Sequence, residues 1–123
     1  MPAAWRRWLA ITALGLAGCL SPTLPLPPPE EPDSIQQGID GVWELRGDCL
    51  AGAEVIVVNE RTGRGAVFVD LQQKGRYVVL IEGEPCDVAV ISQSSGDEGS
   101  GEIRTVLREV EGGIDADPTA CTE

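Results

Sequence analysis

The sequence predicts an all-β fold, a small antiparallel β-sandwich of about six to seven strands, over residues 39–111. Short runs rich in valine and isoleucine recur there, and these branched side chains suit the pleated surface of a strand. Glycine-rich turns separate the runs at close spacing, which is typical of strands that follow one another antiparallel. The span is long enough for one small domain.

Five runs carry this β pattern, and alternate positions within them are expected to form the core. In the run 54–59, Val55 and Val57 fall on one face and Ile56 and Val58 on the other. Both faces are apolar, which indicates a central strand. The runs are 40–46, 54–59, 66–72, 76–82 and 87–92, and the expected core residues are Trp43, Val55, Val57, Val67, Val69, Val79, Ile81, Val88 and Val90.

The last run, residues 103–110, fits either a strand or a helix. Its apolar residues recur at helical spacing, Ser100 could cap a helix and Gly112 could end it. Its β-branched content and the all-β context favour a strand. Residues 112–123 are then expected to form a C-terminal tail.

The N-terminal residues 1–18 predict the signal peptide of a bacterial lipoprotein. Arg6 and Arg7 precede an apolar core of about nine residues, which is too short to span a membrane. The core ends in Leu-Ala-Gly-Cys, the pattern of a lipobox, so Cys19 is expected to be lipidated and to become the mature N-terminus. The alternative is an ordinary secretory signal with an incidental cysteine. Lipidation places the protein in the cell envelope, with the outer membrane expected.

Residues 19–38 are expected to form a disordered linker behind the lipidated cysteine. Most of the nine prolines lie there, and proline fixes φ and lacks a backbone N–H group, which favours extended polyproline II. A spacer that holds the domain off the membrane is the favoured role. A polyproline ligand for a partner domain is the alternative.

The strong acidity of the chain bears on its partners. The sequence has 20 acidic and nine basic residues, and loss of Arg6 and Arg7 with the signal peptide takes the net charge from −11 to about −13. Nucleic acid and anionic lipid surfaces both attract basic proteins. No nucleic-acid partner is therefore expected, and the membrane is contacted through the lipid anchor.

Three cysteines, Cys49, Cys86 and Cys121, remain once Cys19 is lipidated, and one disulfide is expected in an oxidising compartment. If successive strands run antiparallel, Cys49 and Cys86 lie in connections at opposite ends of the sandwich. The chain leaves the last strand at the end that holds Cys86, which favours a Cys86–Cys121 disulfide, because bridged Cα atoms lie within about 7 Å of each other. A flexible tail could instead reach Cys49, and a Cys49–Cys86 bridge would require a different strand count.

Four short stretches suggest a family: AGAEV (51–55), NERTG (59–63), KGRY (74–77) and EGEP (82–85). With Asp70, they make the chain resemble a carboxypeptidase regulatory-like domain, a transthyretin-like (prealbumin-like) β-sandwich, from about Gly41 to Val110. Gly75 and Tyr77 resemble the G-x-[FY] step of that family, in which glycine makes the turn and the aromatic ring enters the core. Asp70 lies further from this glycine than is usual, and CDVAV replaces a tyrosine after the later turn. The resemblance implies an accessory module and no peptidase activity.

No catalytic, cofactor or metal site is expected. The chain has no histidine, no CxxC spacing and no phosphate-binding glycine motif. Asp97, Glu98 and Glu102 offer oxygen ligands for calcium, but the EF-hand spacing is absent and a solvated loop is favoured. The turn RTGRG (61–65) could hold an anion, although a solvated turn is again favoured.

The predicted function is a non-enzymatic, membrane-anchored envelope lipoprotein that presents a small β-sandwich as an accessory or binding module. An envelope protein or a glycan is the expected partner. The alternative is a purely structural subunit of an envelope assembly with no ligand of its own.

Overall fold

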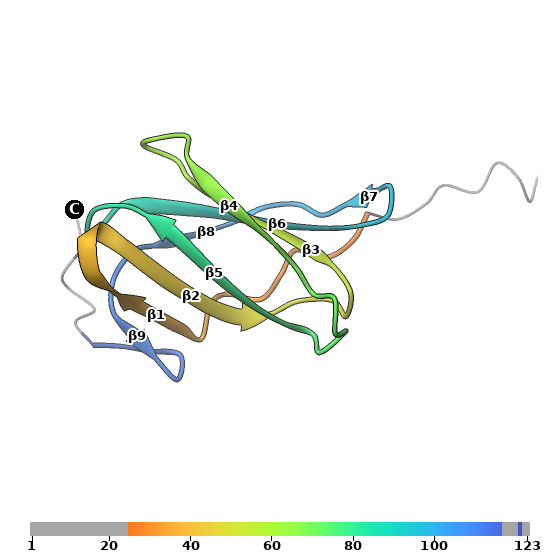
Figure 1. Ribbon diagram of the computed structural model, residues 1–123, viewed down its shortest axis with the longest axis horizontal. Coiled ribbons are helices and arrows are strands. Elements are labelled where there is room, and N and C mark those ends of the chain that lie inside the picture. Colours follow the sequence, from red (N-terminus) through yellow and green to blue (C-terminus); the bar gives the residue numbers. More distant parts are fainter. Residues whose placement is uncertain (1–24, 117–120, 122–123) are drawn as a thin grey trace, which may run out of the picture.

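A computed structural model describes residues 25–116 and Cys121. Two antiparallel sheets of five strands pack face to face, which confirms the predicted all-β sandwich (Figure 1). One sheet has the order β10-β9-β1-β2-β5, and the other has the order β4-β3-β6-β7 with β8 paired to β6. No helix in this part of the chain is long and apolar enough to cross a membrane. The elements are β1 (Ser34–Gln37), the 3-10 turn η1 (Ile39–Gly41), β2 (Val42–Asp48), β3 (Glu54–Asn59), β4 (Gly65–Val69), β5 (Arg76–Glu82), β6 (Val88–Ser95), β7 (Glu98–Gly99), β8 (Ile103–Val106), β9 (Val110–Glu111) and β10 (Ile114–Asp115).

The sandwich begins earlier than the sequence predicts. β1 pairs antiparallel with β2, and its Ile35 is only 1% exposed within the core. The prediction that residues 19–38 form a disordered linker is therefore wrong for residues 34–37. Residues 20–24 and the lipidation site Cys19 lie outside the described residues.

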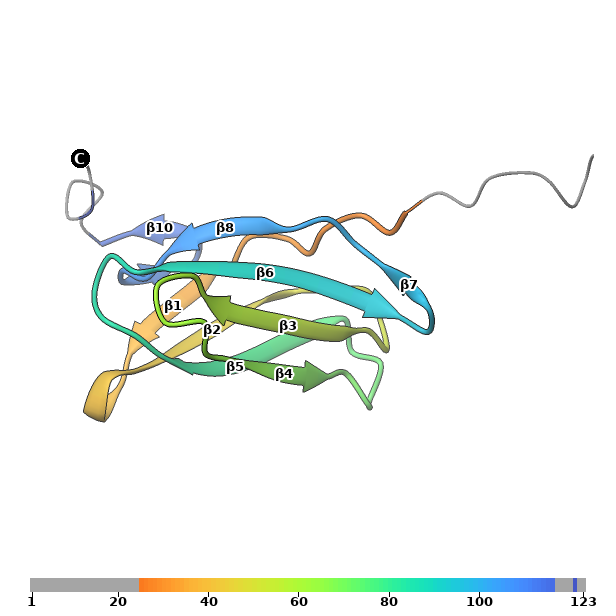
Figure 2. The same cartoon turned by 90° about the horizontal axis from the view of Figure 1, so that it is seen from above.

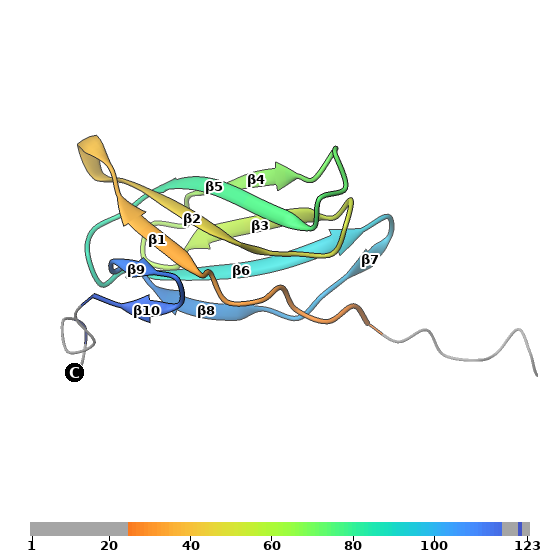
Figure 3. The same ribbon diagram turned by 90° about the horizontal axis from the view of Figure 1, so that it is seen from below.

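The proline-rich residues before β1 also contact the sandwich. Gln93 donates from Nε2 to the carbonyl of Pro27 at 2.8 Å, and the hydroxyl of Tyr77 donates to the carbonyl of Glu30 at 3.2 Å. Figure 3 shows this segment running along the molecule before it enters β1. Proline lacks the N–H group that a strand ladder needs, but its carbonyl still accepts hydrogen bonds. The segment therefore docks through its carbonyls and through N–H groups of its non-proline residues, such as that of Glu30, which donates to the carbonyl of Asp48 at 3.3 Å.

The C-terminal part of the chain also extends the fold. The expected strand over 103–110 is confirmed for β8, which pairs with β6. The chain then bends at the fully buried Leu107, whose N–H group donates to the carbonyl of Asp87 at 2.8 Å. β9 and β10 follow in the other sheet, so the prediction that the domain ends at residue 111 is wrong, since β10 lies within the expected tail.

The core lies between the sheets and contains five of the nine expected residues: Trp43, Val55, Val57, Val79 and Ile81. The prediction is wrong for Val67 and Val69, which are 59% and 43% exposed, because β4 turns Ala66 and Phe68 toward the core instead. It is also wrong for Val88 and Val90, which are half-buried while Ala89 and Ile91 occupy the interior. The other buried residues of the core cluster are Ile35, Leu45, Tyr77, Leu107 and Val110.

Candidate functional site

Exposed apolar side chains gather on one side of the sandwich. Eight large apolar residues are exposed in the described part of the chain, and five of them lie between positions 67 and 80. Leu71 is 85% exposed at the tip of the turn between β4 and β5. We call these five residues the β4–β5 side: Val67, Val69, Leu71, Val78 and Leu80.

The topology brings these residues together because β4 and β5 each end a sheet. β4 is the last strand of one sheet and β5 is the last strand of the other, and both edges lie along the same side of the molecule (Figure 2). Side chains alternate between the two faces of a strand. In β5 the side chains of Tyr77, Val79 and Ile81 point into the core, and those of Val78 and Leu80 therefore point outward. The two strand edges thus share one side of the molecule, with Val67 and Val69 on the outer face of one sheet and Val78 and Leu80 on the outer face of the other.

The backbone of β4 presents unpaired groups along this side. The N–H group of Asp70 donates to the carbonyl of Ala53 at 3.0 Å, and the N–H group of Asn59 donates to the carbonyl of Arg64 at 2.7 Å. Even-numbered residues of β4 therefore direct their peptide groups toward β3, and the N–H and C=O groups of Val67 point away from it. An exposed strand edge of this kind is a template for pairing with another strand.

The turn that carries Leu71 is held by the buried carboxylate of Asp70. Its oxygens accept hydrogen bonds from the N–H groups of Gly52 at 3.0 Å, Lys74 at 3.1 Å and Gly75 at 2.8 Å. The bond from Gly52, followed by that from Gly75, lowers the pKa of Asp70 below its ordinary value. Gly75 has φ +73°, a conformation that glycine adopts without strain. The carboxylate thus fixes the turn from inside and leaves Leu71 exposed.

The two arginines of the RTGRG turn are engaged by carboxylates at the other end of β4. Arg61 donates to both oxygens of Asp87, from Nε at 2.8 Å and from Nη2 at 2.9 Å. Arg64 lies 3.5 Å from the carboxylate of Glu82, across the gap between the edges of β4 and β5. Both guanidinium groups are thus paired with acids, which favours the solvated turn over an anion site.

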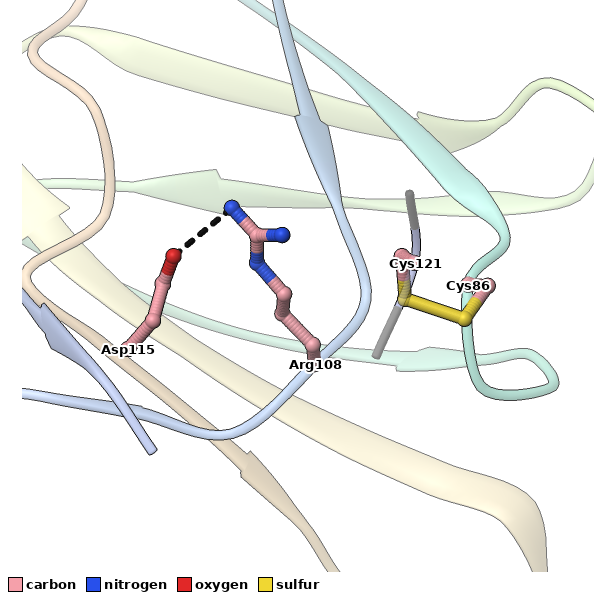
Figure 4. The surroundings of a disulfide bond; sticks show 4 residues. All are labelled: Cys86, Arg108, Asp115 and Cys121. Carbon is pink, nitrogen blue, oxygen red and sulfur yellow. Dashed lines mark ion pairs between the residues drawn. A yellow bond between two sulfur atoms is a disulfide. The ribbon is translucent and has the colours of Figure 1, made fainter. Parts of the chain in front are cut away.

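The predicted Cys86–Cys121 disulfide is present, with the two Cα atoms 5.4 Å apart (Figure 4). It lies in the connection that precedes β6, beside the ion pair of Arg108 with Asp115 at 2.7 Å. Cys49 is free and half-buried near the opposite end, where its N–H group donates to the carbonyl of Gly75. Burial raises the pKa of the Cys49 thiol. The predicted pairing is therefore confirmed, although the chain has more strands than the six that were counted to predict it.

A shallow hollow of about 450 Å³ borders the β4–β5 side on the outer face of β2 and β5. Leu80, Ile39 and Val42 supply apolar walls, and Asp40 and Glu44 supply carboxylates. Glu44 is ion-paired with Arg46. Two carboxylates, one of them ion-paired, do not by themselves form a recognisable catalytic set.

No metal-binding cluster of acidic residues or cysteines occurs among the described residues. Asp97, Glu98 and Glu102, the residues considered for calcium, are all exposed around β7. The structure does not bring them together with a fourth candidate ligand.

Comparisons of the chain with protein-family profiles, with curated proteins and with solved structures find no match. Function therefore has to be argued from the geometry above.

The sequence pattern does not predict the β4–β5 side. Val67 and Val69 were expected in the core because the run AVFV is apolar on both of its faces. One signal could have indicated an interaction edge: residues 65–69 carry no charge in a chain of net charge −11.

Proposed function

We propose that this chain is a non-enzymatic envelope lipoprotein, anchored through Cys19, whose β-sandwich binds a protein through the β4–β5 side. The observation that carries the proposal is the coincidence of two free strand edges with five exposed apolar side chains. Exposed edges are commonly protected by charges, prolines or bulges, and β4 carries no charge and no proline. A surface left in this state is suited to pairing.

A protein partner is favoured over a glycan by the side chains available. Sugar rings commonly stack on exposed aromatic faces, as in many binding sites that combine apolar surface with a few polar groups. The aromatic residues of the described chain are Trp43, Phe68 and Tyr77, and none of them is exposed. Aliphatic side chains beside unpaired backbone groups instead suit a polypeptide strand.

A non-enzymatic role is supported by how the buried acids are used. The carboxylate of Asp70 accepts three backbone hydrogen bonds, and that of Asp87 is held by Arg61, Asn59 and the backbone of Glu84. Both carboxylates stabilise connections between strands. Neither is left available to act as a general acid or base.

The anchor would hold the sandwich close to the lipid surface. Five residues separate Cys19 from Pro25, the first described residue, and the six steps between the two span at most about 20 Å when fully extended. A partner of this module is therefore expected at or near the membrane. The second candidate role is a structural subunit with no ligand of its own.

Anchoring is tested with the full-length chain expressed in a bacterium. The wild type should partition into the detergent phase, and Cys19→Ser should stay in the aqueous phase or remain an unprocessed precursor. A Cys19→Ser protein that partitions like the wild type and has its mature mass would contradict the anchor.

Binding through the β4–β5 side is tested by capture from detergent-solubilised envelopes. Leu71→Glu should no longer capture the proteins that the wild type captures, because it places a charge at the exposed turn of the β4–β5 side. Ile114→Glu is the matched control, since Ile114 is 74% exposed but lies in β10, at the opposite end of its sheet from β5. Equal loss in both variants, or in neither, would contradict this use of the β4–β5 side.

A further inference from the structure

We infer that one end of the sandwich rests directly on the lipid bilayer, through the exposed side chains of Leu50, Leu71 and Lys74. These residues lie in the turns 49–53 and 70–75, which we together call the leucine end. The inference rests on the anchor of the proposed function. It goes beyond that function because it gives the folded domain a second, non-covalent contact with the membrane.

The two turns of the leucine end are tied into one unit by hydrogen bonds. The N–H group of Cys49 donates to the carbonyl of Gly75 at 2.9 Å. The N–H group of Gly52 donates to the carboxylate of Asp70 at 3.0 Å, and the N–H group of Asp70 donates to the carbonyl of Ala53 at 3.0 Å. The connection between β2 and β3 therefore lies beside the connection between β4 and β5, and the exposed side chains of both turns belong to one surface.

The surface of the leucine end is apolar and carries a single exposed charge. Leu71 is 85% exposed and Leu50 is 37% exposed. Lys74 is exposed, whereas Asp70, the other charged residue of the two turns, is buried. Leucine side chains next to a lysine suit the boundary of a bilayer, where the leucines enter the acyl region and the ammonium group stays among the headgroups.

Lys74 is free to meet a lipid phosphate. Every arginine in the part of the chain that the structure describes forms an ion pair with an aspartate or a glutamate, and Lys74 forms none. Zwitterionic phospholipids also carry a phosphate group. The contact therefore does not need an anionic membrane, which would repel a chain of net charge −11.

The anchor brings the leucine end to the membrane. The side chain of Gln93 donates from Nε2 to the carbonyl of Pro27 and accepts at Oε1 from the N–H group of Leu50 at 2.9 Å. The proline-rich segment thus passes beside the leucine end just after Pro25, which lies at most about 20 Å from the lipidated Cys19. Figure 2 shows the start of this segment and the turn from β4 to β5 at the same end of the long axis.

The opposite end of the sandwich lies a strand length further from the anchor. β2 has seven residues, so about 20 Å separate the leucine end from η1. Ile39 of η1 is 83% exposed, which is close to the exposure of Leu71, but it lies at this far end. The short reach of the anchor therefore favours Leu71 for lipid contact.

Two exposed acids define where on the leucine end the contact lies. Asp97 and Glu98 occupy the β6–β7 hairpin at this end of the sandwich. However, β7 and β4 are at opposite edges of their sheet. A bilayer can therefore meet the edge that carries Leu71 while both acids stay in water. Leu71 then borders the β4–β5 side, and the strand residues of that side stay available to a protein partner.

Tryptophan quenching tests the contact with the lipidated, full-length mature protein in vesicles of phosphatidylcholine brominated on its acyl chains. Once residues 1–18 are removed, Trp43 is the one tryptophan left, and it is 2% exposed. Leu71→Trp should lose most of its added emission in these vesicles relative to unbrominated ones, because bromine quenches only at short range. Ile39→Trp is the matched control and should lose little.

Substitutions of Lys74 test the part played by its charge. In the Leu71→Trp background, Lys74→Glu should reduce the quenching, because a carboxylate is repelled by the lipid phosphates. Lys74→Arg keeps the positive charge and should preserve the quenching. Equal quenching in the two variants would show that the lysine does not take part in the contact.

The outcomes separate this inference from the proposed function. A wild-type protein that does not stay with the vesicles would overturn the anchor and this inference together. If the protein stays bound but Leu71→Trp is quenched no more than Ile39→Trp, the inference alone is wrong, because the vesicles contain no other protein. If Leu71→Glu also loses its captured proteins in that case, the turn contacts a protein and not the bilayer.

Discussion

The side chains of Asn59 and Asp87 are hydrogen-bonded to each other, Nδ2 to Oδ2 at 2.9 Å, although 28 positions separate them in the sequence. Asn59 ends β3, and Asp87 lies just before β6. Asn59 also accepts from the N–H group of Arg61 and donates to the carbonyl of Glu82. This pair therefore ties the connection after β3 to the connection after β5, at the end of the sandwich where Arg64 meets Glu82.

The pair makes folding stability depend on acidity. Hydrogen bonds from Arg61 hold the pKa of Asp87 well below its ordinary value, and Asn59 and the N–H group of Glu84 act in the same direction against the effect of burial. A depressed folded-state pKa stabilises the fold at pH values above the unfolded-state pKa of about 3.9, and this contribution is lost as the pH falls further. We expect Asp87→Asn to lower the unfolding free energy at pH 7 by about 1–3 kcal/mol.

Chemical denaturation between pH 7 and pH 3 measures this effect. The difference between wild type and Asp87→Asn should begin to shrink below about pH 4, because the carboxylate of the unfolded chain takes up a proton there while the folded-state carboxylate stays ionised. Asp97→Asn, at an exposed position, is the control and should match the wild type throughout. A difference for Asp87→Asn that stays constant across this range would show that its charge does not matter.

The sequence predicts where most of the strands lie, but it does not reliably predict which face of each strand is buried, for a physical reason. Alternation identifies the buried face only when one phase of a strand is polar, as in β5, where arginine and glutamate flank the run. In β4 both phases are apolar, so the pattern could not distinguish Ala66 and Phe68 from the outward Val67 and Val69. Two of the five residues of the candidate site, Val67 and Val69, are residues that this ambiguity assigned to the core.

The polar contacts of the fold could not be predicted from the sequence, for a different reason. Asn59, Asp70 and Asp87 are residue types that are common in turns, and each follows or precedes a strand. Nothing local indicates that they are buried and bond to backbone groups of other segments. The disulfide was predictable because it depends only on the parity of strand reversals, which errors in strand faces do not change.

Ile35 should be essential to stability, although it lies in a stretch expected to be a passive spacer. β1 has this single apolar residue, so no periodic pattern marks it as a strand. Its side chain is 1% exposed. We expect Ile35→Ala to cost about 2–5 kcal/mol in thermal or chemical denaturation. Ile39→Ala, four positions on and 83% exposed, should cost less than about 0.5 kcal/mol. Equal small effects would show that β1 contributes little.

The disulfide should contribute more to stability than its peripheral position suggests. Cys86 and Cys121 are 35 positions apart, and closing a loop of this length stabilises a fold by about 3–4 kcal/mol in the chain-entropy model. We expect the double variant Cys86→Ser, Cys121→Ser to lose an amount of this order in the midpoint of urea unfolding. Cys49→Ser, which removes the free thiol, should change the midpoint much less. If the double variant is as stable as Cys49→Ser, the disulfide does not stabilise the fold and only holds the end of the chain in place.

The last prediction concerns Gly47, which lies opposite Tyr77 in the β2–β5 pair. A Cβ atom added at Gly47 would come within 2.5 Å of the tyrosine hydroxyl oxygen and 2.7 Å of the ring carbon that bears it. The ring is fully buried, and its hydroxyl holds the carbonyl of Glu30. Gly47→Ala must therefore displace a core aromatic, which we expect to cost about 1–3 kcal/mol.

The same displacement should loosen the proline-rich segment, because the bond from Tyr77 to Glu30 is lost while the bond from Gln93 to Pro27 remains. Limited proteolysis should then cut Gly47→Ala faster than wild type before β1, at temperatures where both remain folded. Gly99→Ala is the matched control, because a Cβ atom at that strand glycine meets nothing within 4 Å. If Gly47→Ala melts and is cleaved like Gly99→Ala, the ring moves freely, and Tyr77 does not hold the segment in place.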